Sequence, residues 1–259
     1  MKAIVIIPAR MSATRFPNKP LARIAGLSMI AHCFLRAKMA KLIQEVYVAT
    51  CDYEIAEEIN GWNGKVIMTS SHHERASDRT AEALTKIEQA EGKKIDVIIM
   101  LQGDEPLINP DCLDELVKNH QQYPAVSVFN LTQFINNEAD FHNINTVKIL
   151  TNLQADILVF SRASIPSSQT QGLTDYKPKK QLGVISFTRD ALMDFYNLPP
   201  TPLEKIESID MMRLLEYGRS IKEVLTDSFM QGVDTIEDAK KVELHMQVDP
   251  IYQKYKAYQ

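Results

Sequence analysis

The sequence opens on the apolar run AIVII, Ala3–Ile7, which passes directly into the loop PARMSATRFPNKPL, Pro8–Leu21. A short run made only of Ala, Ile and Val is typical of a strand that is buried on both faces of a parallel sheet. The loop contains three cationic residues and three prolines, which restrict its backbone. Because ligands of open parallel sheets bind beyond the carboxyl ends of the strands, this loop lies where a binding site is expected.

Further short apolar runs alternate with amphipathic stretches of helical length. The predicted strands are Ala3–Ile7, Glu45–Ala49, Lys65–Met68 and Asp96–Leu101. The predicted helices are Ser28–Leu42, Asp52–Asn60 and Ser77–Glu91, each starting at a residue suited to cap it, and a fourth that begins at Asn109-Pro110. This alternation predicts an α/β fold with a mostly parallel, Rossmann-like sheet and helices on both faces.

The middle of the chain is richer in strands. Strand-like runs occur at Ala125–Leu131, Val147–Leu150, Ile157–Phe160 and Leu182–Phe187, and the polar segment Gln169–Lys180 is predicted to be a mobile surface loop. Helices return at Pro202–Tyr217 and Thr235–Gln247, around a strand at Ile221–Leu225. We therefore expect a single domain over residues 1–259, in which roughly residues 125–190 form an inserted, smaller and more antiparallel subdomain.

Composition narrows the class of protein. With 29 Lys+Arg against 33 Asp+Glu the net charge is −4, which argues against a duplex nucleic-acid binder. The stretch from Lys2 to Arg23 nevertheless has five cationic residues and no acidic one, which suggests a small anionic ligand. The three cysteines form no CxxC pair, and the first apolar run is too short for a signal peptide or a membrane span. We expect a cytoplasmic protein that binds neither nucleic acid nor membrane.

The loop after the first strand is the strongest chemical signal. Arg10, Arg15 and Lys19 are spaced along a stiffened backbone, and a fixed set of cations suits a triphosphate, whose charge is spread over several oxygens. The sequence has neither a Walker A motif nor a GxGxxG motif. On composition alone, a solvated basic loop remains an equal alternative.

Two aspartates follow other predicted strands. In LQGDEP, Leu101–Pro106, the flexible Gly103 allows close approach to a ligand, and Asp104 beside a cationic loop is a natural Mg²⁺ ligand. Glu105 is better explained as part of an ordinary acidic turn. Asp234, which precedes the helix N-cap Thr235, is either a second metal ligand or a charge that stabilises the start of the helix.

Taken in order, the motifs resemble the CMP-3-deoxy-D-manno-octulosonate (CMP-Kdo) synthetase family, sugar-acid cytidylyltransferases of lipopolysaccharide synthesis. Besides PARMSATRFPNKPL and LQGDEP, the matching stretches are IAGLSMIAH (24–32), NTVK (145–148), FSRASIP (160–166), PLEKIE (202–207), RLLEYG (213–218) and GVDTIEDA (232–239). The resemblance implies a nucleotidyltransferase fold, a homodimer, and Mg²⁺ and CTP as cofactor and substrate.

The resemblance also implies roles by position. The nucleotide would be held by Pro8, Ala9, Arg10, Arg15, Lys19, Ser77 and Gln102. Mg²⁺ would be bound by Asp104 and Asp234, and the residues acting in catalysis would be Arg10, Lys19 and Asp104. The sugar acid would be contacted by Arg162, Gln181, Ile185, Ser186, Asp210 and Met211. Its C2 hydroxyl would attack the α-phosphorus of CTP in line, and pyrophosphate would leave, with two Mg²⁺ ions assisting.

The chain departs from the family pattern at the sugar positions. Gln181 and Ile185 stand where the family usually has His and Tyr, while Asp210 and Met211 stand where it has Glu and Gln. The phosphate and metal positions match, so the sequence predicts the same reaction on an altered sugar.

We expect that sugar to be 8-amino-3,8-dideoxy-manno-octulosonate. Its amine is a cation that needs acceptors, which Gln181, Ser186 and Asp210 could offer. The alternatives are Kdo itself, another sugar acid such as a sialic or pseudaminic acid, or a non-catalytic nucleotide sensor. A sensor needs no second metal ligand, so the presence of both Asp104 and Asp234 argues against the last of these.

Overall fold

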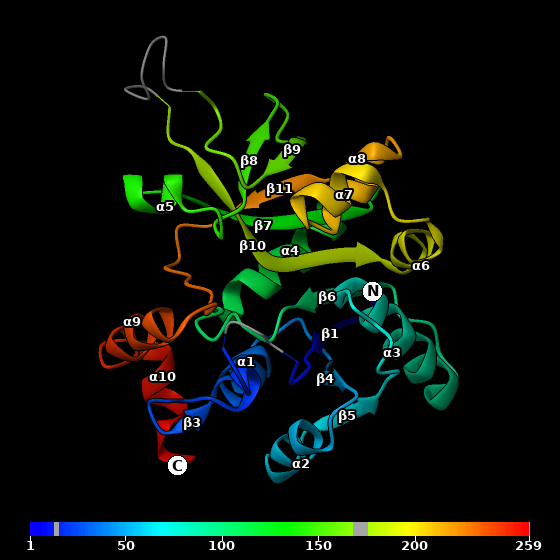
Figure 1. The fold of residues 1–259 in the computed structure, drawn as a ribbon. Coiled ribbons are helices and arrows are strands. Elements are labelled where there is room, and N and C mark those ends of the chain that lie inside the picture. The colour runs from blue at the N-terminus through cyan, green and yellow to red at the C-terminus, as the bar shows by residue number, and fades with distance from the viewer. Residues whose placement is uncertain (13–15, 168–175, 259) are drawn as a thin grey trace.

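The computed structural model describes residues 1–12, 16–167 and 176–258, and its centre is one large sheet (Figure 1). Within these residues the main path of the sheet has the order β11-β7-β10-β6-β1-β4-β5. The strands are β1 (Ala3–Pro8), β4 (Glu45–Thr50), β5 (Lys65–Met68), β6 (Val97–Leu101), β7 (Val128–Phe134), β10 (Lys179–Thr188) and β11 (Lys222–Leu225). Along this path only β10 runs antiparallel to its neighbours, so the mostly parallel sheet is confirmed.

Two more strands, β8 (Lys148–Thr151) and β9 (Ile157–Ser161), extend the sheet beside β10. Every antiparallel pair between strands of this sheet involves β8, β9 or β10. The antiparallel character therefore falls between residues 148 and 188, inside the region where the sequence predicted it.

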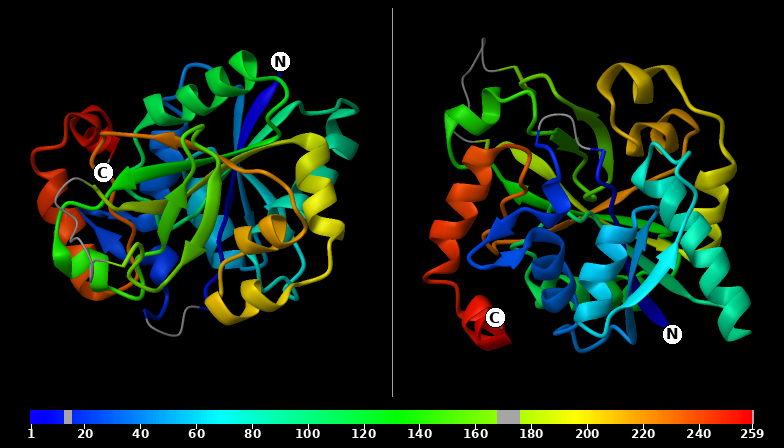
Figure 2. Two further views of the ribbon diagram at one scale, coloured as in Figure 1. Left: turned by 90° about the horizontal axis from the view of Figure 1, so that it is seen from above. Right: turned by 60° about the horizontal axis from the view of Figure 1, so that its bottom comes forward.

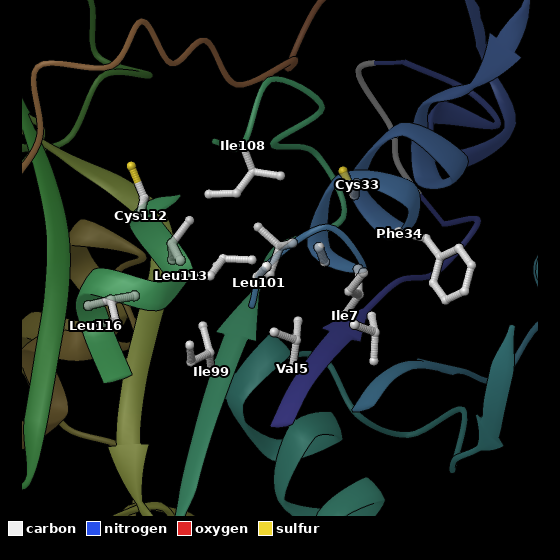
Figure 3. Close-up of a cluster of buried hydrophobic side chains, with 14 of the residues drawn as sticks. Val5, Ile7, Cys33, Phe34, Ile99, Leu101, Ile108, Cys112, Leu113 and Leu116 are labelled. Atoms are coloured by element: carbon white, nitrogen blue, oxygen red, sulfur yellow. The ribbon is translucent and has the colours of Figure 1, made fainter. Parts of the chain in front are cut away.

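Helices cover both faces because the strands are apolar on both sides. Residues of β1 alternate: Val5 and Ile7 pack on one face, and Ile4 and Ile6 on the other. The first face is covered by α1 (Met29–Ala37), α2 (Tyr53–Gly61) and α4 (Pro110–Gln122). Figure 3 shows side chains of α1 and α4 beside those of β1 and β6. The second face is covered by α3 (Ala76–Glu91), α6 (Arg189–Asn197) and α8 (Met211–Glu216), with α7 (Pro202–Glu207) beside α8.

The C-terminal helices α9 (Ile236–Met246) and α10 (Pro250–Tyr255) lie against α1 and the small hairpin of β2 (Arg23–Ile24) and β3 (Leu27–Ser28) (Figure 2). A buried ion pair between Arg36 and Asp249 joins α1 to the start of α10. The Tyr255 hydroxyl lies 2.9 Å from Nε of Arg36 and 2.8 Å from Nδ1 of His32. This end of the chain is thus fixed to the body by polar contacts as well as apolar ones.

Several element boundaries differ from the prediction. The first helix ends at Ala37, and the helix predicted over Pro202–Tyr217 is broken at Ser208, whose φ of 54° is left-handed. Ser77 does not cap α3, which has Arg75 at its N-cap. At the end of the predicted loop Gln169–Lys180, Lys179 and Lys180 belong to β10. Residues 169–175 lie outside the described residues, so the mobility of this loop stays a prediction.

None of the helices in the described ranges is both long enough and apolar enough to cross a membrane.

Candidate active site

A cavity of about 540 Å³ opens at the carboxyl ends of β1 and β6. Segments far apart in the sequence line it: the loop after β1, the start of α3, the Gln102–Glu105 turn, the turn between α5 (Glu138–His142) and β8, the middle of β10, and residues 231–234. The cavity therefore lies at the edge of the sheet that the sequence singled out.

Lys19 joins both predicted metal ligands at the floor of this cavity. Its Nζ lies 2.7 Å from Oδ2 of Asp104 and 3.3 Å from Oδ1 of Asp234, and it donates to the backbone carbonyl of Val233 at 2.9 Å. Burial alone would lower the pKa of Lys19, but the two carboxylates raise it above its ordinary value. The backbone amide of Val233 also donates to the carbonyl of Asp104 at 2.9 Å, which holds the two aspartate segments together.

The predicted phosphate-loop residues are partly described. Pro8, Ala9, Arg10 and Lys19 all line the cavity, and Nη1 of the exposed Arg10 lies 3.4 Å from the carbonyl of His73 across it. Lys19 begins a short 3₁₀ turn, Lys19–Leu21, after Asn18, which adopts a left-handed φ of 57°. Arg15 lies outside the described residues, so its role stays a prediction.

Gln102 lines the cavity where the turn after β6 approaches Gly183 of β10 closely. Its amide donates to the carbonyl of Gly183 at 2.8 Å, and the amide of Gly183 donates to Oε1 of Glu105 at 2.7 Å. A Cβ on Gly183 would lie 3.1 Å from side-chain atoms of both Gln102 and Glu105, so this close approach favours glycine. These two hydrogen bonds link the predicted nucleotide residue Gln102 to the part of β10 that carries predicted sugar residues.

Glu105 is not an ordinary acidic turn residue, and that interpretation was wrong. Its side chain is only 6% exposed, and its Oε2 has no hydrogen-bond partner among the described residues. Burial and the neighbouring Asp104 raise the pKa of Glu105 to about 7. The sequence missed this because the amide that donates to Glu105 belongs to Gly183 in β10, about 80 positions further along the chain.

Gly103 also has a packing role besides the predicted one. A Cβ at Gly103 would lie 3.0 Å from Cδ1 of Ile30 and 3.3 Å from the carbonyl of Pro8. The missing side chain therefore allows the end of β6 to approach the end of β1 and α1, and not only a ligand.

Ser77, predicted to contact the nucleotide, is buried and is not among the described residues that line the cavity. Its hydroxyl donates to Oδ2 of Asp210 at 3.1 Å, while Nη1 of Arg75 lies 3.2 Å from the other oxygen of Asp210. Burial raises the pKa of Asp210, and Arg75 partly opposes this shift. Ser77 thus positions a predicted sugar residue, because the first turn of α3 directs its side chain toward α8.

Arg162 stands in the cavity wall with its guanidinium held by backbone carbonyls. It donates to the carbonyls of Ile144, Glu207 and Ser208 at 3.0, 2.7 and 3.4 Å. A cation held by neutral dipoles keeps its full charge, so Arg162 can attract a carboxylate in the cavity.

Lys148 supports the same wall from behind. Its side chain is fully buried, and Nζ donates to the carbonyls of Asn143, Thr146 and Arg162 at 2.9, 2.6 and 2.7 Å. Burial and the nearby charge of Arg162 lower the pKa of Lys148. Sequence reasoning assigned it no role, although a lysine inside the apolar run Val147–Leu150 was a signal of a buried cation.

Besides Arg162, four of the predicted sugar residues line the cavity, and one does not. Gln181, Ile185, Asp210 and Met211 are in the wall, and Ile185 and Met211 are almost completely buried. The prediction for Ser186 was wrong, because successive residues of a strand face opposite sides of the sheet. Ser186 lies on the α4 face, fully buried, with its Oγ 3.0 Å from Nε2 of His120, whose pKa burial lowers to about 4.

Comparisons with known proteins agree with this geometry. A family model described as cytidylyltransferase matches residues 4–221. The 3-deoxy-manno-octulosonate cytidylyltransferase of Geobacter sulfurreducens is 39% identical over 252 residues, which cover 93% of this chain and 98% of that protein. The 8-amino-3,8-dideoxy-manno-octulosonate cytidylyltransferase of Shewanella halifaxensis is 37% identical over 250 residues, covering 96% of this chain and 100% of that one.

A solved structure agrees as well. The structure of a CMP:2-keto-3-deoxy-manno-octonic acid synthetase complexed with CTP matches with a TM-score of 0.86 and 34% identity, over 96% of this chain and 99% of that one. The shared motifs, the cavity at the sheet edge and the full-length matches lead to one conclusion: this chain belongs to the cytidylyltransferase family of nucleotidyltransferase enzymes.

Proposed function

We propose that this enzyme transfers the cytidylyl group of CTP to the C2 hydroxyl of an eight-carbon 3-deoxy sugar acid and releases pyrophosphate. The observation that carries the proposal is the Lys19 ammonium held between Asp104 and Asp234 in a cavity that also presents Arg10 and Arg162. The names of the relatives, which act on 3-deoxy-manno-octulosonate or its 8-amino analogue, support the substrate class.

The cationic side chains that line the cavity would bind different substrates. Arg10 and Lys19 lie on the loop after β1, where they would bind the phosphates of CTP together with Arg15. Arg162 follows β9 in another part of the cavity lining and donates to the carbonyl of Glu207 in α7; there it would bind the carboxylate of the sugar acid. Separate sites for the two charged groups in one cavity would hold the C2 hydroxyl near the α-phosphorus, and such positioning can supply a large part of the rate.

Asp104 and Asp234 fit a Mg²⁺ ion. Their oxygens converge on one cation, the Lys19 ammonium, and carboxylates completed by substrate phosphates are a common Mg²⁺ ligand set. When bound, Mg²⁺ would make the sugar hydroxyl more acidic and offset phosphate charge. Lys19, once its contacts shift to the phosphates, would stabilise charge that develops on the leaving pyrophosphate. No side-chain nucleophile is needed.

Within this substrate class we favour 8-amino-3,8-dideoxy-manno-octulosonate. Gln181 provides an amide in the cavity wall, and Asp210 provides a carboxylate, already contacted by Arg75 and Ser77. Ser186 no longer counts among the acceptors because it faces α4. Kdo, or another sugar acid, is the alternative substrate, and two of the similar proteins, the Geobacter sulfurreducens relative and the solved structure, are named as Kdo enzymes. The expected homodimer and the cytoplasmic location stay predictions.

Paired kinetics with the two octulosonates test this choice. The purified enzyme, CTP and Mg²⁺ are held constant while each sugar is varied, and CMP-sugar is measured by chromatography. We expect the higher kcat/KM with the 8-amino sugar. A higher kcat/KM with Kdo would refute the choice of sugar and leave the cytidylyl transfer intact.

A further inference from the structure

The pairing of β10 with β7 is irregular next to the sugar site. Its register shifts between Gln181 and Ile185, so the backbone of Leu182–Val184 departs from the regular ladder. The side chain of Asn130 on β7 compensates: its Nδ2 lies 2.9 Å from the carbonyl of Leu131, 3.1 Å from that of Leu182 and 3.4 Å from that of Val184. Asn130 is fully buried, so these contacts replace water.

These contacts decide which way the Asn130 amide points. Backbone carbonyls only accept hydrogen bonds, so the nitrogen of Asn130 must face them and its Oδ1 must face away. Nε2 of Gln181 donates to this Oδ1 at 2.7 Å. If the Gln181 amide were flipped, its oxygen would face Oδ1 of Asn130 at that distance, and the two acceptors would repel each other. The nitrogen of Gln181 is therefore fixed toward Asn130, and its Oε1 points away from Asn130.

We infer that Asn130 is a positioning residue for the sugar site: by holding the amide nitrogen of Gln181, it turns the amide oxygen of Gln181 toward a hydrogen-bond donor of the sugar acid. This rests on the proposed function, since Gln181 lines the cavity in which the sugar would bind. The donor is a hydroxyl or an ammonium group. An ammonium group gains more from a fixed acceptor because the hydrogen bond is charge-assisted.

A double-mutant cycle tests this inference with Asn130→Ala, Gln181→Met and the double variant. Methionine has a similar length and lacks the amide. Using 8-amino-3,8-dideoxy-manno-octulosonate and Kdo in turn, we expect each single variant to lower kcat/KM for the preferred sugar about tenfold, mainly through KM, and to reduce the selectivity between the sugars. KM for CTP should stay within about twofold. The double variant should be no worse than Gln181→Met.

Thr132→Val is the matched control. Thr132 lies on the same strand, is fully buried and pairs with Gln181 in the β7–β10 ladder, but its hydroxyl donates to Glu223 at 3.1 Å and not to the side-chain amide of Gln181. It should lose thermal stability and leave the sugar KM unchanged. If Asn130 were only structural, Asn130→Ala would resemble this control, and that outcome would overturn the inference.

The remaining outcomes are also decisive. Additive losses in the cycle would show that Asn130 acts independently of Gln181, and would overturn the inference while the proposed function stands. If Asn130→Ala does not fold, Asn130→Ser takes its place in the cycle, and an unchanged sugar KM in Gln181→Met overturns the inference because it removes Gln181 from the sugar site. If the wild-type enzyme converts neither octulosonate, both the inference and the proposed function fall.

Discussion

Replacing the buried Lys148 by Met should weaken binding of the sugar acid and leave nucleotide binding unchanged. The variant keeps the length of the side chain and removes the ammonium that three backbone carbonyls share. Two of those carbonyls belong to the turn before β8, and the third is that of Arg162. We therefore expect a lower free energy of unfolding and weaker binding of the sugar-acid carboxylate by Arg162.

The size of the effect follows from the three acceptors. A buried acceptor left unpaired costs about 1–3 kcal/mol, and removing the buried charge recovers part of that, so we take the low end for each carbonyl. The loss of about 3 kcal/mol corresponds to a fall in Tm of roughly 6–12 °C for a chain of this size. KM for the sugar acid should rise at least about tenfold, because a loss of 1.4 kcal/mol in binding already gives that factor.

Thermal unfolding followed by circular dichroism and initial rates with each substrate varied would measure these effects. Lys118→Met is the matched control, since Lys118 is exposed on α4 and, among the residues that the structure describes, forms an ion pair only with the exposed Glu115. It should change Tm by no more than about 2 °C. If Lys148→Met were as stable as this control and kept its sugar KM, the carbonyl-holding role of Lys148 would be refuted.

Two other predictions concern the α4 face of the sheet. Ser186→Ala should lower the free energy of unfolding by about 1–2 kcal/mol in urea titrations, because it leaves Nε2 of His120 unpaired, and it should not change the sugar KM; a raised sugar KM would restore Ser186 to the sugar site. The pKa of His120 is about 4 in the fold against an ordinary 6.5, so its contribution to stability is present above pH 6.5 and is lost as the pH falls toward 4. His120→Gln should remove up to about 3 kcal/mol of that pH dependence. The similar contribution of His32, whose pKa is also lowered to about 4, and the opposite one of Glu105, whose pKa is raised to about 7, would remain. An unchanged slope would contradict the burial of a neutral His120.

The fold could be predicted from the sequence because its signals are local. Runs such as Ala3–Ile7 and Asp96–Leu101 are apolar at every position, so each predicts its own strand without reference to a partner. The break at Ser208 could not be predicted in this way, because the residues on both sides of it have helical patterns. Tertiary packing of α7 and α8 decides that break.

The site was predicted in part, for a similar reason. Lys19, Asp104 and Asp234 come together because each lies in the segment that follows a strand of the sheet. The predicted strands already indicate this placement in the sequence. The environment of Glu105 depends on a contact with Gly183 that local patterns do not contain. The error at Ser186 could have been avoided, since Ile185 and Ser186 are adjacent in a strand and cannot both face one cavity.

Pyrophosphate release tests the proposed activity most directly. The purified enzyme would be given CTP, Mg²⁺ and each octulosonate, with Asp104→Asn as the paired variant and circular dichroism as the check on its fold. We expect pyrophosphate to appear only when a sugar acid is present, in equal amount to the CMP-sugar, and to fall at least about a hundredfold in a folded Asp104→Asn enzyme. No release with either sugar, or undiminished release from Asp104→Asn, would contradict cytidylyl transfer at the site built by Lys19, Asp104 and Asp234.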